Sequence, residues 1–310
     1  MDFKDNNGII NEYKACRLCP RNCKADRTRK VGYCNENDTL HVSRAALHMW
    51  EEPCISGTKG SGTVFFSGCN MGCVFCQNRK ISKGEVGKHI SEDRLVDIFF
   101  ELQDKGGNNI NLVTADMFIP SVKRAIERAK NLGIKIPFLL NTASYLNVET
   151  IKSLEGLIDI YLPDFKYIKE EDAIRYSHAP GYVDAAKAAI EEMIRQRPEC
   201  HFRDDENGQH LLEQGVVVRD LLIPGQVIQA KMILKYLYEK YGDSIYISLM
   251  NQFTPNGELK DYPEIDRTIK ESEYRSLIKY AQQLGLSNGY IQVGETASES
   301  FIPNFNCEGV

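Results

Sequence analysis

Cysteines are the residues of this sequence whose number and spacing point most directly to chemistry. Seven of the ten fall into two groups, with the patterns C-x2-C-x3-C-x10-C and C-x3-C-x2-C. The first group is Cys16, Cys19, Cys23 and Cys34, and the second is Cys69, Cys73 and Cys76. Thiols stay reduced in the cytosol, where clustered cysteines bind metals more often than they pair as disulfides. We therefore expect two metal sites.

The three-cysteine group leaves one coordination position open. A structural zinc site usually has four protein ligands, whereas a [4Fe–4S] cluster with three cysteine ligands keeps one iron free for a substrate or cofactor. Gly68 and Gly72 relieve the backbone for a tight wrap around such a cluster. The group therefore predicts a catalytic [4Fe–4S] cluster, and the alternative is a zinc loop with a distant fourth ligand.

The four-cysteine group supplies a complete ligand set within nineteen residues. Four thiolates suit a tetrahedral zinc site, and they equally suit a second, auxiliary [4Fe–4S] cluster that relays electrons or docks a partner. The spacing does not separate zinc from a cluster. Cys54 is either a substitute ligand or a small buried thiol.

After residue 60, short apolar runs typical of buried strands alternate with helical patterns. The apolar runs cover 63–67, 109–114, 136–140, 157–162, 216–223, 244–249 and 289–293, and the helical patterns begin after Ser91 and cover 120–132, 226–241 and 271–284. Repeated strand–helix units imply a parallel sheet. We predict an α/β fold with two parts: a small Cys-rich metal-binding extension over residues 1–60, and a partial (β/α)6-type TIM-like barrel over residues 61–310.

The predicted strands run into polar residues at their carboxyl ends, which is where barrels of this kind carry their chemistry. These residues are Thr114, Asp116, Asn141, Thr142, Ser144, Asp164 and Lys166. Any one of them alone would be an ordinary solvated loop residue. Arg219 lies inside an apolar strand, so its charge must face either a ligand or a buried ion-pair partner. Together these residues predict one site on the same rim as the second cysteine group.

Residues 67–78, Ser-Gly-Cys-Asn-Met-Gly-Cys-Val-Phe-Cys-Gln-Asn, resemble the C-x3-C-x-aromatic-C signature of the radical S-adenosylmethionine (SAM) superfamily. Further segments resemble its pyruvate formate-lyase activating-enzyme-like branch, in the subgroup with an N-terminal cysteine extension. They are the segments beginning at Cys16, Glu51, Asn109, Ile158 and Val217. The resemblance extends over about residues 14–255.

The resemblance implies a role for each matching position. Cys69, Cys73 and Cys76 would hold the [4Fe–4S] cluster, with SAM on the free iron. Phe75 would lie by the adenine, Asn141, Thr142 and Ser144 near the ribose, and Arg219 near the SAM carboxylate; Asp164 and Lys166 match an Asp-x-Lys pair of activating enzymes. Family members usually bind the SAM amino group with a Gly-Gly-Glu loop. This chain has Thr114-Ala115-Asp116 instead, in which Thr114 and Asp116 could serve.

The reaction that this resemblance implies is reductive. An oxidoreductase of this kind cleaves SAM to methionine and a 5′-deoxyadenosyl radical, which abstracts hydrogen from a substrate. It needs a reductant such as flavodoxin or ferredoxin. The substrate stays open between a glycyl-radical enzyme activated by this protein, another protein or peptide, and a small molecule. A non-catalytic zinc-binding scaffold is the alternative of a different class.

The composition narrows the remaining possibilities. The chain has 310 residues, a formal net charge of −5 and 42% hydrophobic residues, which is ordinary globular usage. A mildly acidic balance argues against general nucleic-acid binding. No segment approaches the ~20 apolar residues of a membrane-spanning helix, so we expect no membrane contact. The first seven residues lack the apolar core of a signal peptide, which leads us to expect a cytoplasmic location.

Overall fold

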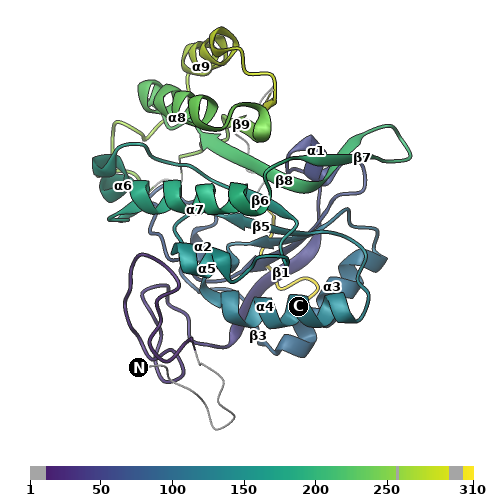
Figure 1. Ribbon diagram of the computed structural model, residues 1–310. Helices are drawn as coiled ribbons and strands as arrows, with labels where there is room; N and C mark the ends of the chain where they lie inside the picture. The colour runs from purple at the N-terminus through teal and green to yellow at the C-terminus, as the bar shows by residue number, and fades with distance from the viewer. Residues whose placement is uncertain (1–11, 256–257, 293–302) are drawn as a thin grey trace.

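The computed structural model describes residues 12–255, 258–292 and 303–310, and a mostly parallel sheet forms its centre (Figure 1). The strand order among these residues is β10-β9-β8-β6-β5-β4-β2-β1-β3, with β7 paired to β8 outside this path. The strands are β1 (Leu40–His48), β2 (Ser61–Phe66), β3 (Lys88–Ile90), β4 (Ile110–Val113), β5 (Phe138–Thr142), β6 (Ile160–Pro163), β7 (His201–Asp204), β8 (His210–Leu221), β9 (Tyr246–Met250) and β10 (Gly289–Ile291).

Helices cross the sheet between successive parallel strands, and α3, α4, α5 and α7 cover one of its faces (Figure 1). The helices are α1 (Pro53–Ser56), α2 (Arg79–Ser82), α3 (Glu92–Asp104), α4 (Ile119–Asn131), α5 (Val148–Lys152), α6 (Glu170–Ser177), α7 (Tyr182–Gln196), α8 (Val227–Tyr241) and α9 (Glu271–Leu284). Ser91 caps α3 as predicted, because its side chain accepts a hydrogen bond from the backbone N–H of Arg94.

The α/β class and the parallel sheet are confirmed. Every apolar run predicted as a strand overlaps a strand of the parallel part of the sheet, where β2, β4, β5, β6, β8, β9 and β10 pair in parallel with their neighbours. In the described part of the chain, β3 and β10 each have one neighbour only, so the barrel does not close. This arrangement is consistent with a partial barrel.

The sheet also contains a strand that our sequence analysis did not predict. β1 pairs antiparallel with β2 on one side and with β3 on the other. Its sequence, LHVSRAALH, is buried over most of its length on both faces and so lacks the alternation of a half-buried strand. The predicted division into residues 1–60 and 61–310 falls between β1 and β2, two neighbours in one sheet, and it stays a prediction.

The chain returns to β1 at its C-terminal end. The backbone N–H of Cys307 donates to the carbonyl oxygen of Ser43 at 3.0 Å, and that of Ala45 donates to the carbonyl of Glu308 at 2.8 Å. Phe305 packs edge-on against Phe65 of β2, with ring centroids 5.4 Å apart. The C-terminal residues 305–308 therefore contact β1 and the end of β2, after which the second cysteine group begins.

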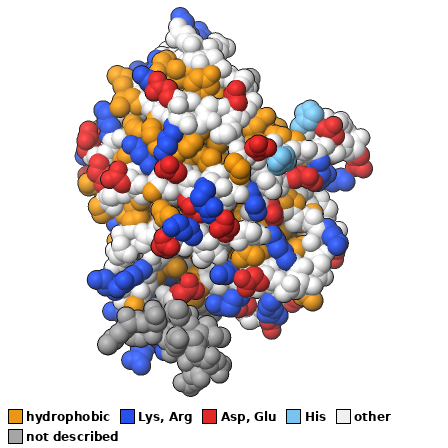
Figure 2. All heavy atoms as spheres, viewed as in Figure 1, with side chains coloured by type: hydrophobic (Ala, Val, Ile, Leu, Met, Phe, Trp, Pro, Cys, Tyr) orange, Lys and Arg blue, Asp and Glu red, His pale blue; other side chains and the backbone are white. Residues whose placement is uncertain are grey.

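On the face shown in Figure 2, basic and acidic side chains are intermixed. This agrees with the small net charge of the chain. Among the described residues, no helix is long and apolar enough to cross a membrane.

The buried carboxyl group of Asp220 lowers the stability of the folded protein at neutral pH. Asp220 of β8 is 1% exposed, and neither of its oxygens has a hydrogen-bond partner among the described residues. Burial raises the pKa of this carboxyl well above its usual value. Its pKa is therefore higher in the folded than in the unfolded chain. Asp220 accordingly destabilises the fold as the pH rises from about 4, the pKa of an unperturbed Asp.

We expect Asp220→Asn to raise the free energy of unfolding at pH 7 by about 1–3 kcal/mol, because the variant need not take up a proton in order to fold. The gain should shrink toward pH 4, where wild-type Asp220 is protonated in both states. Urea unfolding at several pH values measures both effects, with Asp261→Asn as an exposed control. Equal pH dependence of Asp220→Asn and wild type would contradict this prediction.

Candidate active site

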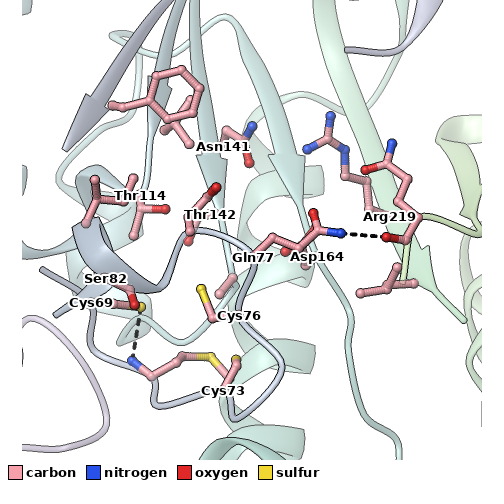
Figure 3. A pocket seen from close by; sticks show the side chains of 18 of the residues that line it. Cys69, Cys73, Cys76, Gln77, Ser82, Thr114, Asn141, Thr142, Asp164 and Arg219 are labelled. Atoms are coloured by element: carbon pink, nitrogen blue, oxygen red, sulfur yellow. Dashed lines mark hydrogen bonds between the residues drawn. The ribbon is translucent and has the colours of Figure 1, made fainter. Parts of the chain in front are cut away.

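The carboxyl ends of the parallel strands surround a cavity of about 270 Å³. The residues that follow β2, β4, β5, β6 and β9 reach it, as does β8. Figure 3 shows Cys69, Cys73 and Cys76 close together on one side of this cavity, with Asn141 and Arg219 further along it. The structure thus brings the second cysteine group and the polar strand ends into one site, as parallel strands require.

Backbone hydrogen bonds fix the start of the cysteine loop. The N–H of Gly68 donates to the carbonyl oxygen of Ile81 at 2.7 Å, and the N–H of Cys69 donates to that of Cys34 at 3.4 Å. Gly68 has a φ of 81°, and a Cβ at this position would lie 2.3 Å from Cγ of Glu36. A residue with a side chain would be strained at this φ and would collide with Glu36, so the turn from β2 into the loop requires glycine at position 68.

Two of the three sulfurs accept hydrogen bonds. Sγ of Cys69 accepts from the backbone N–H of Met71 at 3.4 Å, and Sγ of Cys73 accepts from the hydroxyl of Ser177 at 2.9 Å. Burial raises the pKa of both thiols, that of Cys69 the more strongly. As free thiols they are therefore protonated at neutral pH, and a metal would have to displace their protons.

The chemistry of this donor set fits a cluster. Within the described ranges, no three His, Cys, Asp or Glu side chains are arranged to hold a single metal ion. A [4Fe–4S] cluster is wider than one ion, so its cysteine ligands stand further apart. Three thiols on one short loop, with hydrogen bonds to sulfur and an adjoining polar cavity, match the ligand set of such a cluster and leave one iron without a protein ligand.

Seven of the other predicted site residues line the same cavity: Phe75, Thr114, Asn141, Thr142, Asp164, Lys166 and Arg219. They come from the cysteine loop and from the ends of β4, β5, β6 and β8. Thr114 follows β4 in the left-handed region, with a φ of 56°. Phe75 packs against Phe253, with ring centroids 5.3 Å apart. The cavity wall therefore combines an aromatic face with hydroxyl, amide and charged groups.

The other two predicted residues, Asp116 and Ser144, are not among the residues that line the cavity. Asp116 accepts a hydrogen bond from the hydroxyl of Thr142 at 2.9 Å, and burial raises its pKa to about 7. The hydroxyl of Ser144 donates to the carbonyl oxygen of Asp164 at 2.7 Å. Both side chains thus stand behind residues of the cavity wall, where they position Thr142 and Asp164.

Lys166 and Asp164 form an ion pair at the end of β6, with Nζ and Oδ2 2.5 Å apart. The two side chains are 14% and 20% exposed. Burial by itself would lower the pKa of Lys166, but Asp164 and the neighbouring Cys73 outweigh it and raise that pKa. An ion pair with a protonated ammonium group therefore forms part of the cavity wall.

Arg219 has partners that our sequence analysis did not identify. Its guanidinium donates to Glu52 at 2.8 and 2.6 Å and also to Glu51, and all three side chains are at most 10% exposed. The structure thus shows the buried ion pair that was one of the two interpretations of this arginine, although Arg219 and Glu51 also line the cavity. The sequence feature that could have predicted this ion pair is the two adjacent glutamates before Pro53, because a buried arginine requires an acidic partner.

The sequence of this region is similar to a known protein family. Residues 63–202 match the family model of the Radical SAM superfamily. These residues are therefore similar to a radical SAM domain. The matched residues contain most of β2, the cysteine loop and the strands β4, β5 and β6. They therefore include most of the cavity wall but not Glu51, Glu52 or Arg219, which lie outside the matched residues.

A second similarity in sequence extends beyond the residues that match the family model. An uncharacterised protein of Methanocaldococcus jannaschii is 28% identical over 283 residues, which cover 89% of this chain and 77% of that protein. The similarity to this relative thus spans more of the chain than the match to the family model does.

Two solved structures resemble the fold at low sequence identity. A radical SAM methyltransferase from Sphaerobacter thermophilus is 12% identical, with a TM-score of 0.49 over 79% of this chain and 70% of that one. Streptococcus suis SuiB bound to its precursor peptide SuiA is 12% identical, with a TM-score of 0.46 over 74% of this chain. The chain spans 47% of SuiB, about half of its length.

Proposed function

We propose that this protein is a radical SAM enzyme, which cleaves SAM reductively at a [4Fe–4S] cluster held by Cys69, Cys73 and Cys76. One observation carries the proposal: the three thiols and the polar ends of four neighbouring strand regions line a single cavity. When bound, the cluster supplies the electron that converts SAM into methionine and a 5′-deoxyadenosyl radical. The chain itself has to bind SAM, orient it and exclude water.

The cavity wall offers a partner for each part of SAM. Asn141, Thr142 and Thr114 provide amide and hydroxyl groups for the ribose and for the amino acid portion. Phe75 provides an aromatic face for the adenine. Phe66, Met71, Ile81, Leu221 and other apolar residues line the remaining wall. An apolar wall around a reactive radical prevents side reactions with solvent.

The test is 5′-deoxyadenosine formation under anaerobic conditions, with iron-reconstituted protein, SAM and dithionite. We expect the product to accumulate with time. We expect none when dithionite is left out, because the cleavage needs an electron. Absence of the product from protein with a verified cluster and verified SAM binding would overturn the proposed function and favour a non-catalytic scaffold.

Lys166 provides a test of SAM binding that does not need turnover. Lys166 lines the cavity, and we propose that its ammonium group donates a hydrogen bond to SAM. Because a hydrogen bond to a charged group contributes about 1.5–3 kcal/mol, we expect Lys166→Met to raise the Kd for SAM about 10- to 100-fold. The iron content should stay that of wild type. Equilibrium dialysis on reconstituted protein measures the Kd, with Lys169→Met as the control, since Lys169 is not among the residues that line the cavity. An unchanged Kd would remove Lys166 from the SAM site.

For the substrate, we propose a glycine residue in a peptide segment of a partner protein, so that this enzyme acts as a glycyl-radical activase. The resemblance to activating enzymes supports this choice. Trp50 lines the cavity and is 57% exposed, so the cavity extends to the protein surface there. A peptide loop could enter the site beside this side chain.

Purified pyruvate formate-lyase is the probe for this finer proposal. After incubation with reconstituted enzyme, SAM and reductant, we expect the electron paramagnetic resonance spectrum of a glycyl radical on the lyase. If SAM is cleaved but no protein radical forms on the lyase, an activase acting on this partner is excluded while the radical SAM chemistry stands. The substrate would then be another peptide or a small molecule.

A further inference from the structure

The N-terminal cysteines lie around a second, smaller cavity of about 20 Å³ beside the cysteine loop. Cys16, Cys19, Cys23 and Cys34 all line it, together with Asn70 of the loop and Asp116. Backbone hydrogen bonds fold this part of the chain back on itself: the N–H of Cys16 donates to Ala25 and that of Lys24 donates to Cys16, each at 3.1 Å. These two bonds close the chain between Cys16 and Ala25 and so bring the first three cysteines of the group together.

A buried arginine adds a separate observation. Arg27 is 1% exposed and lines the same cavity. It donates to the carbonyl oxygens of Glu36, Asn37 and Met117 at 3.1, 2.5 and 2.6 Å, and to Sγ of Cys16 at 3.8 Å. Among the described residues it forms no salt bridge with an acidic side chain, unlike the buried Arg219. Asp116 lines the same cavity but lies beyond salt-bridge distance of Arg27. A thiolate at Cys16, whose Sγ is 3.8 Å from Nη1 of Arg27, would therefore be the closer anion for this buried cation.

We propose that Cys16, Cys19, Cys23 and Cys34 hold a second [4Fe–4S] cluster and that this cluster delivers electrons to the SAM-binding cluster. The delivery step rests on the proposed function; the cluster itself does not. Zinc would bind about 2.3 Å from each sulfur and so needs closely converging thiols. The four cysteines here instead line a cavity of about 20 Å³, which is room for about one water molecule. Four thiols around one cavity without such convergence favour the wider cluster.

The two cysteine groups are in direct contact. The carbonyl oxygen of Cys34 accepts the hydrogen bond of the Cys69 N–H at 3.4 Å. Nε of Arg21, from the N-terminal segment, donates to the carbonyl of Asn70 at 3.0 Å. A ligand of the second cluster is thus joined to a ligand of the first through one hydrogen bond, which provides a short route for an electron.

The four cysteines differ in exposure, which indicates where an electron would enter the second cluster and where it would leave. Cys23 is exposed, whereas Cys34 is buried and contacts Cys69. Lys24, Arg29 and Lys30 are exposed in the same segment, which suits an acidic one-electron carrier such as a flavodoxin or ferredoxin. One electron leaves the reduced carrier and reduces the second cluster. The second cluster is reoxidised when it passes this electron to the SAM-binding cluster.

Metal analysis of a variant that lacks the first site tests the second site on its own. In Cys69→Ala/Cys73→Ala/Cys76→Ala, reconstituted anaerobically, we expect about four iron atoms and the absorption of an iron–sulfur cluster, against about eight in wild type. Adding Cys19→Ala and Cys23→Ala should remove this iron, and adding Cys54→Ala should not. Circular dichroism checks that each variant is folded. Zinc in place of iron, or no metal in the folded triple variant, would overturn the proposal.

The delivery step has its own test on the full-length enzyme. We expect Cys23→Ala, with its SAM-binding cluster verified by electron paramagnetic resonance, to form 5′-deoxyadenosine at least about tenfold more slowly than wild type when reduced flavodoxin is the donor. With dithionite, a small reductant that can reach the first cluster directly, the change should be less than about twofold. Equal losses with both donors would overturn the relay. A wild type that holds both clusters but never cleaves SAM would instead refute the proposed function.

Discussion

Replacing Cys73 by alanine should abolish 5′-deoxyadenosine formation. Cys73 lines the large cavity between Cys69 and Cys76 on one loop, and its sulfur accepts the Ser177 hydrogen bond at 2.9 Å. A cluster with three cysteine ligands cannot lose one and keep a single open iron for SAM. We therefore expect the product of Cys73→Ala to lie below detection under conditions in which wild type turns over.

Cys200→Ala is the matched control for this experiment. Cys200 is partly buried like Cys73, but it lines neither of the two cavities. We expect this variant to keep the iron content and the rate of wild type. If Cys73→Ala forms 5′-deoxyadenosine at the wild-type rate, the second cysteine group is not the site of cleavage and the proposed function fails.

Arg219→Met should cause the largest loss of stability among the substitutions considered. The variant leaves Glu51 and Glu52 buried, at 9% and 5% exposure, without their cation. Removing one partner of a buried ion pair costs about 3–5 kcal/mol, because the remaining charge is uncompensated. Urea unfolding at pH 7 measures this loss. Arg275→Met removes an exposed pair with Glu271 and should cost no more than about 1 kcal/mol.

The pH dependence of the Arg219→Met variant follows from the sign of the pKa change. Burial by itself would raise the pKa of Glu52, but Arg219 outweighs it and lowers that pKa in the folded protein. In wild type this contribution is present above the unfolded pKa of about 4.3 and is lost as the pH falls through the folded value. Without Arg219, burial alone acts and acid should stabilise the variant. The difference between the two proteins should therefore narrow from pH 7 toward pH 4.

Adding Glu51→Gln and Glu52→Gln to Arg219→Met distinguishes the loss of charge balance from the loss of packing. If uncompensated charge causes the instability, the triple variant should recover most of the lost free energy at pH 7. A triple variant as unstable as Arg219→Met would show that the arginine acts through its packing alone.

Local sequence patterns predicted much of the fold. β4, β5 and β6 are runs of buried apolar residues between helices with clear ends, so periodicity and capping were enough to locate them. β1 was missed because burial on both faces removes the alternation that distinguishes a half-buried strand. Its place in the sheet depends on pairing with β2 and β3, which a local pattern cannot show.

The sequence by itself determined the chemistry that we propose for the main site, because the proposed ligands Cys69, Cys73 and Cys76 are close in the chain and lie on one loop. Parallel strands also oblige Thr114, Asn141 and Asp164 to share one edge of the sheet. Only the tertiary structure decided which side chains face the cavity. It placed Asp116 behind Thr142 and gave Arg219 the partners Glu51 and Glu52. It also set Cys34 against Cys69. These contacts join residues from 26 to 168 positions apart, and packing in three dimensions selects them because buried charges and polar groups must find partners wherever the fold brings them.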